Sequence, residues 1–200
     1  MAQDHNIQDI LPSLISNDLF QDSIPAIDVF DLDYFEQRIK ELKTSFNEDF
    51  ITHTLAMKAN PIKGIVLFAK NHGLGTETAS ICETLHALSL EIEPKKIVFD
   101  SPCKTKNDLE QAMKQGVQIT LDNEHEIEMV GELLETICKD TQSSFGLRIN
   151  PVIGQGTMIF SSTATRASKF GLPILPETKA GINCFSFYMN FLFENHRDQF

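Results

Sequence analysis

The sequence predicts an α/β protein, and within that class a partial (β/α)8 barrel of the TIM type. Two observations lead to this prediction. From about residue 50 onward, short apolar segments alternate with longer segments of helical periodicity, which is typical of parallel strands joined by crossover helices. The first strand then runs into Lys58-Ala59-Asn60-Pro61, without the Gly-rich turn that an open doubly wound sheet usually has there. The missing turn favours the barrel, while periodicity alone leaves both architectures open.

About five strand–helix units can be placed along the chain. Strands are expected at residues 52–57, 74–79, 96–99, 117–121 and 145–149, and helices at 61–71, 80–90, 104–115, 123–138 and 176–188. In the first of these helices the apolar residues fall on one face, with Pro61 near its start and Gly73 just past its end. Thr105 and Asp108 form a possible cap pairing for the third. Before the first unit we expect an amphipathic helix at 7–15, an extended segment at 24–30 and a helix at 31–43.

The length of the chain, compared with that of a complete barrel, predicts its domain organisation. A complete barrel usually takes about 250 residues, whereas this chain has 200 residues and places five units after a stretch of roughly 50. We therefore expect residues 1–23 to form an N-terminal helical extension and residues 24–200 to form an incomplete α/β-barrel domain. An incomplete barrel leaves an edge strand and an apolar face uncovered. Either the chain is a fragment, or another polypeptide completes it.

Composition excludes several classes of function. Seventeen Lys and Arg against 28 Asp and Glu give a net charge of −11, so binding to nucleic acid or anionic membranes is disfavoured. The four cysteines form no C-x-x-C pair, and we expect no metal site. The N-terminal residues show no basic and apolar signal pattern, so we expect no secretory signal, and no apolar run approaches the roughly 20 residues that span a bilayer. We expect a cytoplasmic protein with free thiols.

Lys58 is the candidate catalytic residue. It lies at the end of the first strong strand, and the carboxyl ends of the strands in a parallel barrel face the active site. Desolvation there would lower the pKa of the lysine, and a neutral amine can form a Schiff base with an aldehyde cofactor. The ordinary alternative is a surface lysine at the end of a strand.

Residues 56–61, Ala-Met-Lys-Ala-Asn-Pro, resemble the lysine motif of the fold-type III decarboxylases that depend on pyridoxal 5'-phosphate (PLP). This group includes the ornithine, diaminopimelate and arginine decarboxylases. Other segments resemble the family in the same order, namely residues 25–30, 73–80, 96–104, 121–124, 146–151 and 168–171. The resemblance spans roughly residues 24–176.

The resemblance implies the N-terminal barrel of the alanine racemase and decarboxylase type, without the C-terminal β domain. It implies a PLP-dependent amino-acid decarboxylase in which Lys58 forms a Schiff base with PLP. Glu77 would lie beside the cofactor, where many relatives carry Asp, and Arg148 would lie at the floor of the cofactor site. Lys169 matches a lysine that reaches across the homodimer interface of full-length relatives. The ordinary alternatives are an ion pair between Glu77 and Arg148 at the strand ends and a solvated charge at Lys169.

The sequence also departs from the family pattern. The family's ring-stacking histidine, its phosphate-binding Gly-rich loop and the glutamate that pairs with the pyridine nitrogen are not identifiable in it. We therefore expect the 200-residue chain alone to have little or no activity. The substrate amino acid stays open, because the family sets it largely with residues after the fifth strand and with the second domain.

Two alternative functions stay open. The first is a PLP-dependent amino-acid racemase on the same barrel, but racemases continue the motif with a Tyr-Gly-His-Gly-like run. Here Pro61-Ile62-Lys63-Gly64 follows, which favours a decarboxylase. The second is a catalytically dead homologue that binds a regulatory partner, against which the retention of Lys58 argues.

Overall fold

The computed structural model describes residues 7–17, 19, 26–154, 163–166 and 168–174. The chain divides into two compact units, Met1–Ile51 and Thr52–Phe200. The first unit contains α1 (Ile7–Ser16) and α2 (Leu32–Ser45), which confirms the two helices predicted there. Helix α2 begins after Asp31, whose side chain accepts a hydrogen bond from the backbone N–H of Tyr34. The predicted domain boundary between residues 23 and 24 stays a prediction, because residues 20–25 lie outside the described residues.

The second unit is built on one parallel sheet whose strands follow chain order. Each of its strands pairs in parallel with the next one along the chain, in the order β1-β2-β3-β4-β5. This confirms the predicted α/β fold with about five units, although the helix expected at 176–188 lies outside the described residues. The strands are β1 (Thr54–Ala56), β2 (Gly75–Thr78), β3 (Ile97–Asp100), β4 (Gln118–Leu121) and β5 (Phe145–Leu147).

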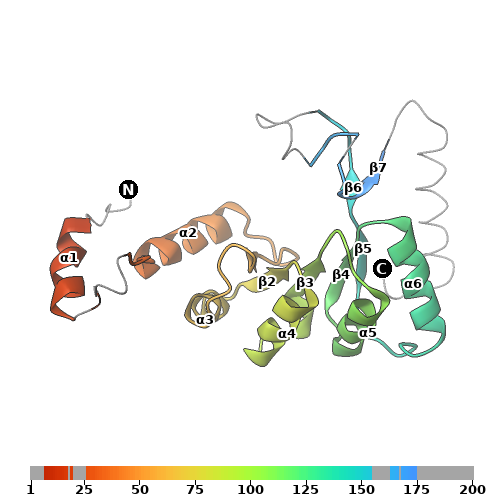
Figure 1. Cartoon of the computed structure of the whole chain (residues 1–200), viewed down its shortest axis with the longest axis horizontal. Coiled ribbons are helices and arrows are strands. Elements are labelled where there is room, and N and C mark those ends of the chain that lie inside the picture. The colour runs from red at the N-terminus through yellow and green to blue at the C-terminus, as the bar shows by residue number, and fades with distance from the viewer. Residues whose placement is uncertain (1–6, 18, 20–25, 155–162, 167, 175–200) are drawn as a thin grey trace. The chain divides into compact units, whose positions relative to one another are not determined.

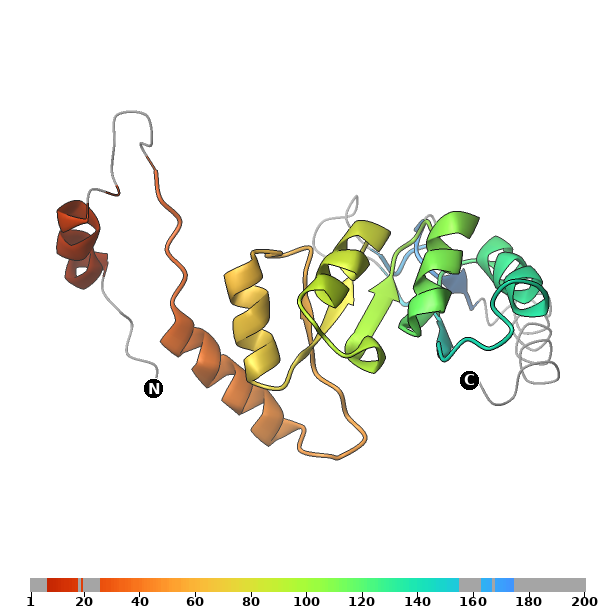
Figure 2. The same ribbon diagram turned by 90° about the horizontal axis from the view of Figure 1, so that it is seen from below.

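Helices alternate with these strands and follow one another along the sheet (Figure 1 and, turned by 90°, Figure 2). They are α3 (Lys63–Asn71), α4 (Ile81–Ser89), α5 (Lys106–Gln115) and α6 (Glu124–Glu135), with the short 3-10 helix η1 (Pro94–Lys96) before β3. A separate pair of short parallel strands, β6 (Ile149–Asn150) and β7 (Leu172–Pro173), follows β5.

The hydrophobic core lies between the sheet and its helices. Alternate strand residues point to this side, among them Ile97 and Phe99 of β3 and Ile119 and Leu121 of β4, all of them buried. They pack with apolar residues of the helices such as Val66 of α3. Burying this apolar surface on one side of the sheet stabilises the half-barrel arrangement.

Local signals fix where the helices begin and end. Thr105 and Asp108 form the predicted capping box at the start of α5, and Gly116 ends that helix in the left-handed conformation at φ 74°. Ser80 and Asn123 cap α4 and α6 with side chains that accept from the backbone N–H groups of Glu83 and Glu126. Each of these three helices therefore starts just beyond the carboxyl end of the preceding strand.

The other face of the sheet carries polar side chains. Ala56, Glu77 and Val98 are partners in register across β1, β2 and β3, and partners in a parallel sheet point to the same face. Asp100 and Thr120 are partners further along the same face. Glu77, Asp100 and Thr120 are all partly exposed, unlike the residues that face the helices. In a closed barrel this face would line the interior.

Candidate functional site

Five charged residues gather at the carboxyl ends of five consecutive strands. Lys58 follows β1, Glu77 lies near the end of β2, Asp100 ends β3, Asp122 follows β4 and Arg148 follows β5. Because all five strands are parallel, these ends form one edge of the sheet. In barrels of this kind that edge carries the active site.

Lys58 lies in the turn that leaves β1. The preceding residue, Met57, is fully buried, and its backbone N–H donates to the carbonyl of Glu77 at 2.9 Å. The Lys58 amine (Nζ) lies 3.7 Å from the Glu77 carboxylate (Oε1). The structure therefore brings together two of the three residues expected at the cofactor.

The sequence predicted a desolvated amine at Lys58, and this prediction is wrong for the part of the chain that the structure describes. The Lys58 side chain is 64% exposed, whereas that of Glu77 is 20% exposed. The amine is consequently open to reagents from solution.

Arg148 is held by two carboxylates and one aromatic ring. Its Nη1 lies 3.3 Å from Oδ1 of Asp100 and 3.5 Å from Oδ1 of Asp122, and the guanidinium stacks 4.5 Å from the Phe170 ring centroid. The alternative ion pair between Glu77 and Arg148 is not what the structure has, because Glu77 pairs with Lys58 and Arg148 with the aspartates.

Asp122 is a site residue that the sequence did not predict. Its side chain is 2% exposed, and its Oδ1 has no hydrogen-bond partner among the described residues beyond the longer ion-pair contact to Arg148. Burial raises the pKa of Asp122 above its ordinary value, while a hydrogen bond from the Gly171 backbone and the charge of Arg148 act in the opposite direction. The only sequence signal was its position directly after the fourth strand.

A buried ion pair behind this edge was also not predicted. Lys104 and Glu126 are 0% and 1% exposed, and Lys104 Nζ lies 2.8 Å from Glu126 Oε2. Lysine and glutamate are almost never fully buried unless they are paired. Their spacing of 22 residues gave no local sign of this contact.

Lys169 lies beside a cavity of about 510 Å³ near the start of α6. Its side chain is exposed, and Nζ lies 5.2 Å from the Phe170 ring centroid. The cavity is also lined by Asp122, which connects it to the edge described above. The expected place of Lys169 at an interface between two copies stays a prediction.

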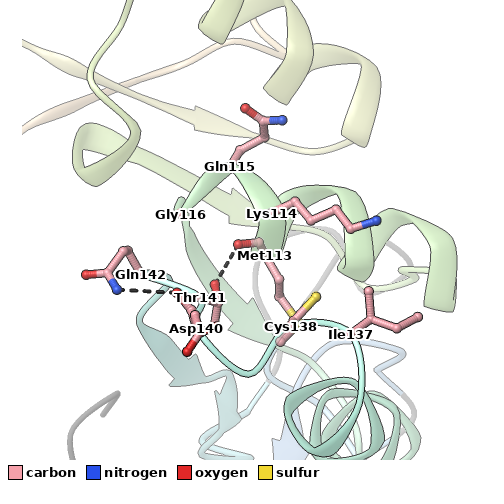
Figure 3. Close-up of a pocket in the computed structure, with 9 residues that line it drawn as sticks. All are labelled: Met113, Lys114, Gln115, Gly116, Ile137, Cys138, Asp140, Thr141 and Gln142. Atoms are coloured by element: carbon pink, nitrogen blue, oxygen red, sulfur yellow. Dashed lines mark hydrogen bonds between the residues drawn. The ribbon is translucent and has the colours of Figure 1, made fainter.

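A second, smaller cavity of about 280 Å³ lies at the other end of the strands (Figure 3). It is lined by residues from the end of α5 and from the segment that leads into β5, and none of the predicted site residues is among them. Thr141 Oγ1 donates to the Met113 carbonyl there at 2.5 Å. Burial and the nearby Glu110 raise the pKa of the Cys138 thiol in this cavity, opposed by Lys114. Its position at the amino ends of the strands separates it from the candidate site.

The described residues contain neither a candidate metal site nor a candidate membrane-spanning helix. No group of three or more His, Cys, Asp or Glu side chains among them could hold a metal ion. No helix in the described part of the chain is long and apolar enough to cross a bilayer.

Comparison with known proteins shows which family the chain resembles. A family model described as "Pyridoxal-dependent decarboxylase, pyridoxal binding domain" matches residues 32–184. The chain is 31% identical over 157 residues to a diaminopimelate decarboxylase of Helicobacter pylori, covering 78% of this chain and 38% of that protein. It is 29% identical over 148 residues to the diaminopimelate decarboxylase of Campylobacter jejuni, covering 73% and 36%.

The structure of the chain resembles solved members of the same group. A crystal structure of Helicobacter pylori diaminopimelate decarboxylase complexed with L-lysine matches with a TM-score of 0.69 at 25% identity, covering 86% of this chain and 42% of that one. The chain thus spans between 36% and 38% of the length of the two relatives named above. Since the family model matches well over half of the 200 residues, the chain belongs to the family of pyridoxal-binding domains of pyridoxal-dependent decarboxylases.

Proposed function

We propose that this chain provides the PLP-binding part of an amino-acid decarboxylase, with Lys58 as the catalytic residue that binds the cofactor covalently. One observation carries the proposal. The lysine of the family-like motif lies at the carboxyl end of β1, exposed to solvent and 3.7 Å from the carboxylate of Glu77.

The donor groups at this edge fit the aldehyde end of PLP. A primary amine can condense with an aldehyde, and the Glu77 carboxylate, 3.7 Å from Lys58 Nζ, can orient that amine at the edge. Arg148 supplies a fixed positive charge at the same edge, because Asp100 and Asp122 hold it from two sides. When bound, PLP accepts the electron pair that remains as CO₂ departs.

The reaction class follows from the family rather than from the geometry. The family and the relatives named above are decarboxylases, which does not favour the racemase or the non-enzymatic regulator. We propose an amino acid as substrate, with diaminopimelate first among the candidates because the named relatives are diaminopimelate decarboxylases.

We further propose that two copies associate with Lys169 near their interface. The free thiols of Cys82, Cys103 and Cys138 support a cytoplasmic location.

Cofactor binding is tested by titrating the purified chain with PLP and recording its absorbance. We expect a visible band from the covalent adduct, which Lys58→Ala abolishes. Lys63→Ala is the matched control, because Lys63 is also exposed and lies only five residues further along. A folded chain without the band, or a Lys58→Ala variant that keeps it, contradicts the proposal.

The reaction class is tested by the product formed. With diaminopimelate or ornithine as substrate, we expect little or no CO₂ release from the 200-residue chain alone, and the loss in Lys58→Ala of any release above that of free PLP. Racemised alanine formed without any release of CO₂ would identify the racemase instead.

A further inference from the structure

We propose that Glu126 is a positioning residue whose buried carboxylate clamps two strand–helix loops together and so holds Arg148 in the candidate site. The loops are residues 101–105, between β3 and α5, and residues 122–123, between β4 and α6. The functional part of this inference rests on the proposed function, since it concerns the site in which Arg148 is expected to lie.

Each oxygen of Glu126 holds a different loop. Oε1 accepts a hydrogen bond from the backbone N–H of Lys104 at 3.0 Å. Oε2 accepts one from the backbone N–H of Asp122 at 2.9 Å. Glu126 itself is fixed in the first turn of α6, where its backbone N–H donates to the side chain of the N-cap residue Asn123 at 3.0 Å. The carboxylate thus bridges the backbone at Lys104 and at Asp122, which are 18 residues apart in the sequence.

Lys104 is the ion-pair partner of Glu126 in the interior. Its Nζ lies 2.8 Å from Glu126 Oε2 and also donates to the carbonyl of Ser101 at 2.6 Å. The ammonium lies 5.6 Å from the ring centroid of Phe99. Burying two charges is costly even when they are paired, and apolar residues of similar volume often stabilise a fold as well. Because stability alone gives little reason for a buried ion pair, we infer that the pair of Lys104 and Glu126 serves to position the two loops.

One of the two carboxylates that hold Arg148 lies on a clamped loop, and the other lies directly before the other clamped loop. Asp100 directly precedes the first loop, and Asp122 begins the second. Their Oδ1 atoms lie 3.3 Å and 3.5 Å from the same nitrogen of Arg148. Because Asp100 is fixed in the sheet, in register with Thr120 of β4, it is the position of Asp122 beside the guanidinium that depends on the loop held by Glu126.

The clamp needs a carboxylate and not merely a polar side chain of that size. Two backbone N–H groups on separate loops require two acceptor oxygens, and a glutamine has one acceptor oxygen and one NH₂ donor. Glu126→Gln therefore releases one of the loops. It also leaves the Lys104 ammonium buried without a counter-charge, which threatens folding.

Three variants separate positioning from stability. Glu126→Gln breaks the clamp, and the double variant Lys104→Met with Glu126→Gln breaks it while removing both buried charges together. Val66→Ala is the destabilised control, because Val66 is fully buried in the core on α3 and is not one of the clamp residues. Folding of each variant is checked by circular dichroism and urea unfolding.

The readout is the rate at which phenylglyoxal modifies Arg148, mapped by mass spectrometry. The Arg148 side chain is 28% exposed, so its release raises the rate by up to about 3.6-fold, the ratio of full exposure to 28%. We expect this rise in Glu126→Gln and in the double variant, and the wild-type rate in Val66→Ala. Arg38, which is 60% exposed in the first unit, is the internal reference in every sample. We also expect weaker PLP binding in the two clamp variants and unchanged binding in Val66→Ala.

The results bear separately on this inference and on the proposed function. If Glu126→Gln does not fold, the double variant supplies the reading. A wild-type Arg148 rate in the folded double variant, or an equal rise in Val66→Ala, overturns the clamp. If the wild-type chain takes up no PLP while the Arg148 rates change as expected, the clamp stands and the proposed function fails.

Discussion

Gly75 lies at a close approach between two strands, and replacing it with alanine should displace β2. The backbone N–H of Gly75 donates to the carbonyl of His53 at 2.8 Å. A Cβ atom built on Gly75 would lie 2.1 Å from the carbonyl oxygen of Lys96 and 3.0 Å from its Cβ. The nearest atom is backbone at the end of η1, so it cannot rotate away as a flexible side chain could.

The cost of Gly75→Ala follows from the size of this overlap. Ordinary contacts between carbon and oxygen are above 3 Å, so the backbone must move by about 1 Å. Overpacking of this kind typically costs about 1–3 kcal/mol, and replacing glycine by alanine in the chain returns about 0.5–1 kcal/mol. We expect Gly75→Ala to lower the free energy of unfolding by about 1–2 kcal/mol. Since Glu77 lies two residues further along β2, its distance from Lys58 should change as well.

The assay is urea unfolding of Gly75→Ala beside Gly146→Ala. Gly146 is the matched control, because it lies in β5 and a Cβ built there meets nothing within 4 Å. We expect Gly146→Ala to leave the unfolding free energy unchanged or to raise it by up to about 1 kcal/mol. Equal stability of the two variants would refute the steric reasoning.

Three further substitutions have effects that can be worked out in the same way. Thr105→Ala removes the capping box of α5 and should lower the free energy of unfolding by about 1 kcal/mol in urea. Gly116→Ala places a side chain at φ 74° and should cost about 1 kcal/mol by the same assay, so an unchanged value would contradict the left-handed cap. Asp122→Asn tests the raised pKa of a carboxyl whose ordinary value is 3.8. A raised folded-state pKa means that the folded chain binds this proton more tightly, so the contribution of Asp122 to stability falls as pH rises above that value. The stability of Asp122→Asn relative to wild type should therefore increase from pH 3 toward pH 7, as followed by urea unfolding at each pH, and a constant difference would refute the raised pKa.

Much of the fold could be predicted because its signals are local. The apolar face of 61–71 predicted α3, and the pair Thr105 and Asp108 predicted the start of α5, because caps and helical periodicity depend on residues three or four apart. The predicted strand at 145–149 was only partly right. The backbone N–H of Arg148 donates to Leu121 of β4 and its carbonyl accepts from Leu172 of β7, so the chain changes partners there and two strands form.

The candidate site was predictable only where a motif marked it. Lys58 and Glu77 were expected together and lie 3.7 Å apart. The roles of Asp122 and of the buried pair Lys104 and Glu126 depend on contacts between loops that are distant in the sequence, and no local pattern records such contacts. The apolar pattern around Lys58 placed the lysine at the end of a strand but could not indicate that its side chain is 64% exposed.

The claim that Lys58 binds PLP is tested most directly by trapping the adduct. The folded chain is incubated with PLP, reduced with borohydride and digested, and the modified lysine is identified by mass spectrometry. We expect the label on Lys58, in preference to other exposed lysines such as Lys63 and Lys95. A folded sample in which Lys58 is unlabelled, or labelled no more than those two, would contradict the account.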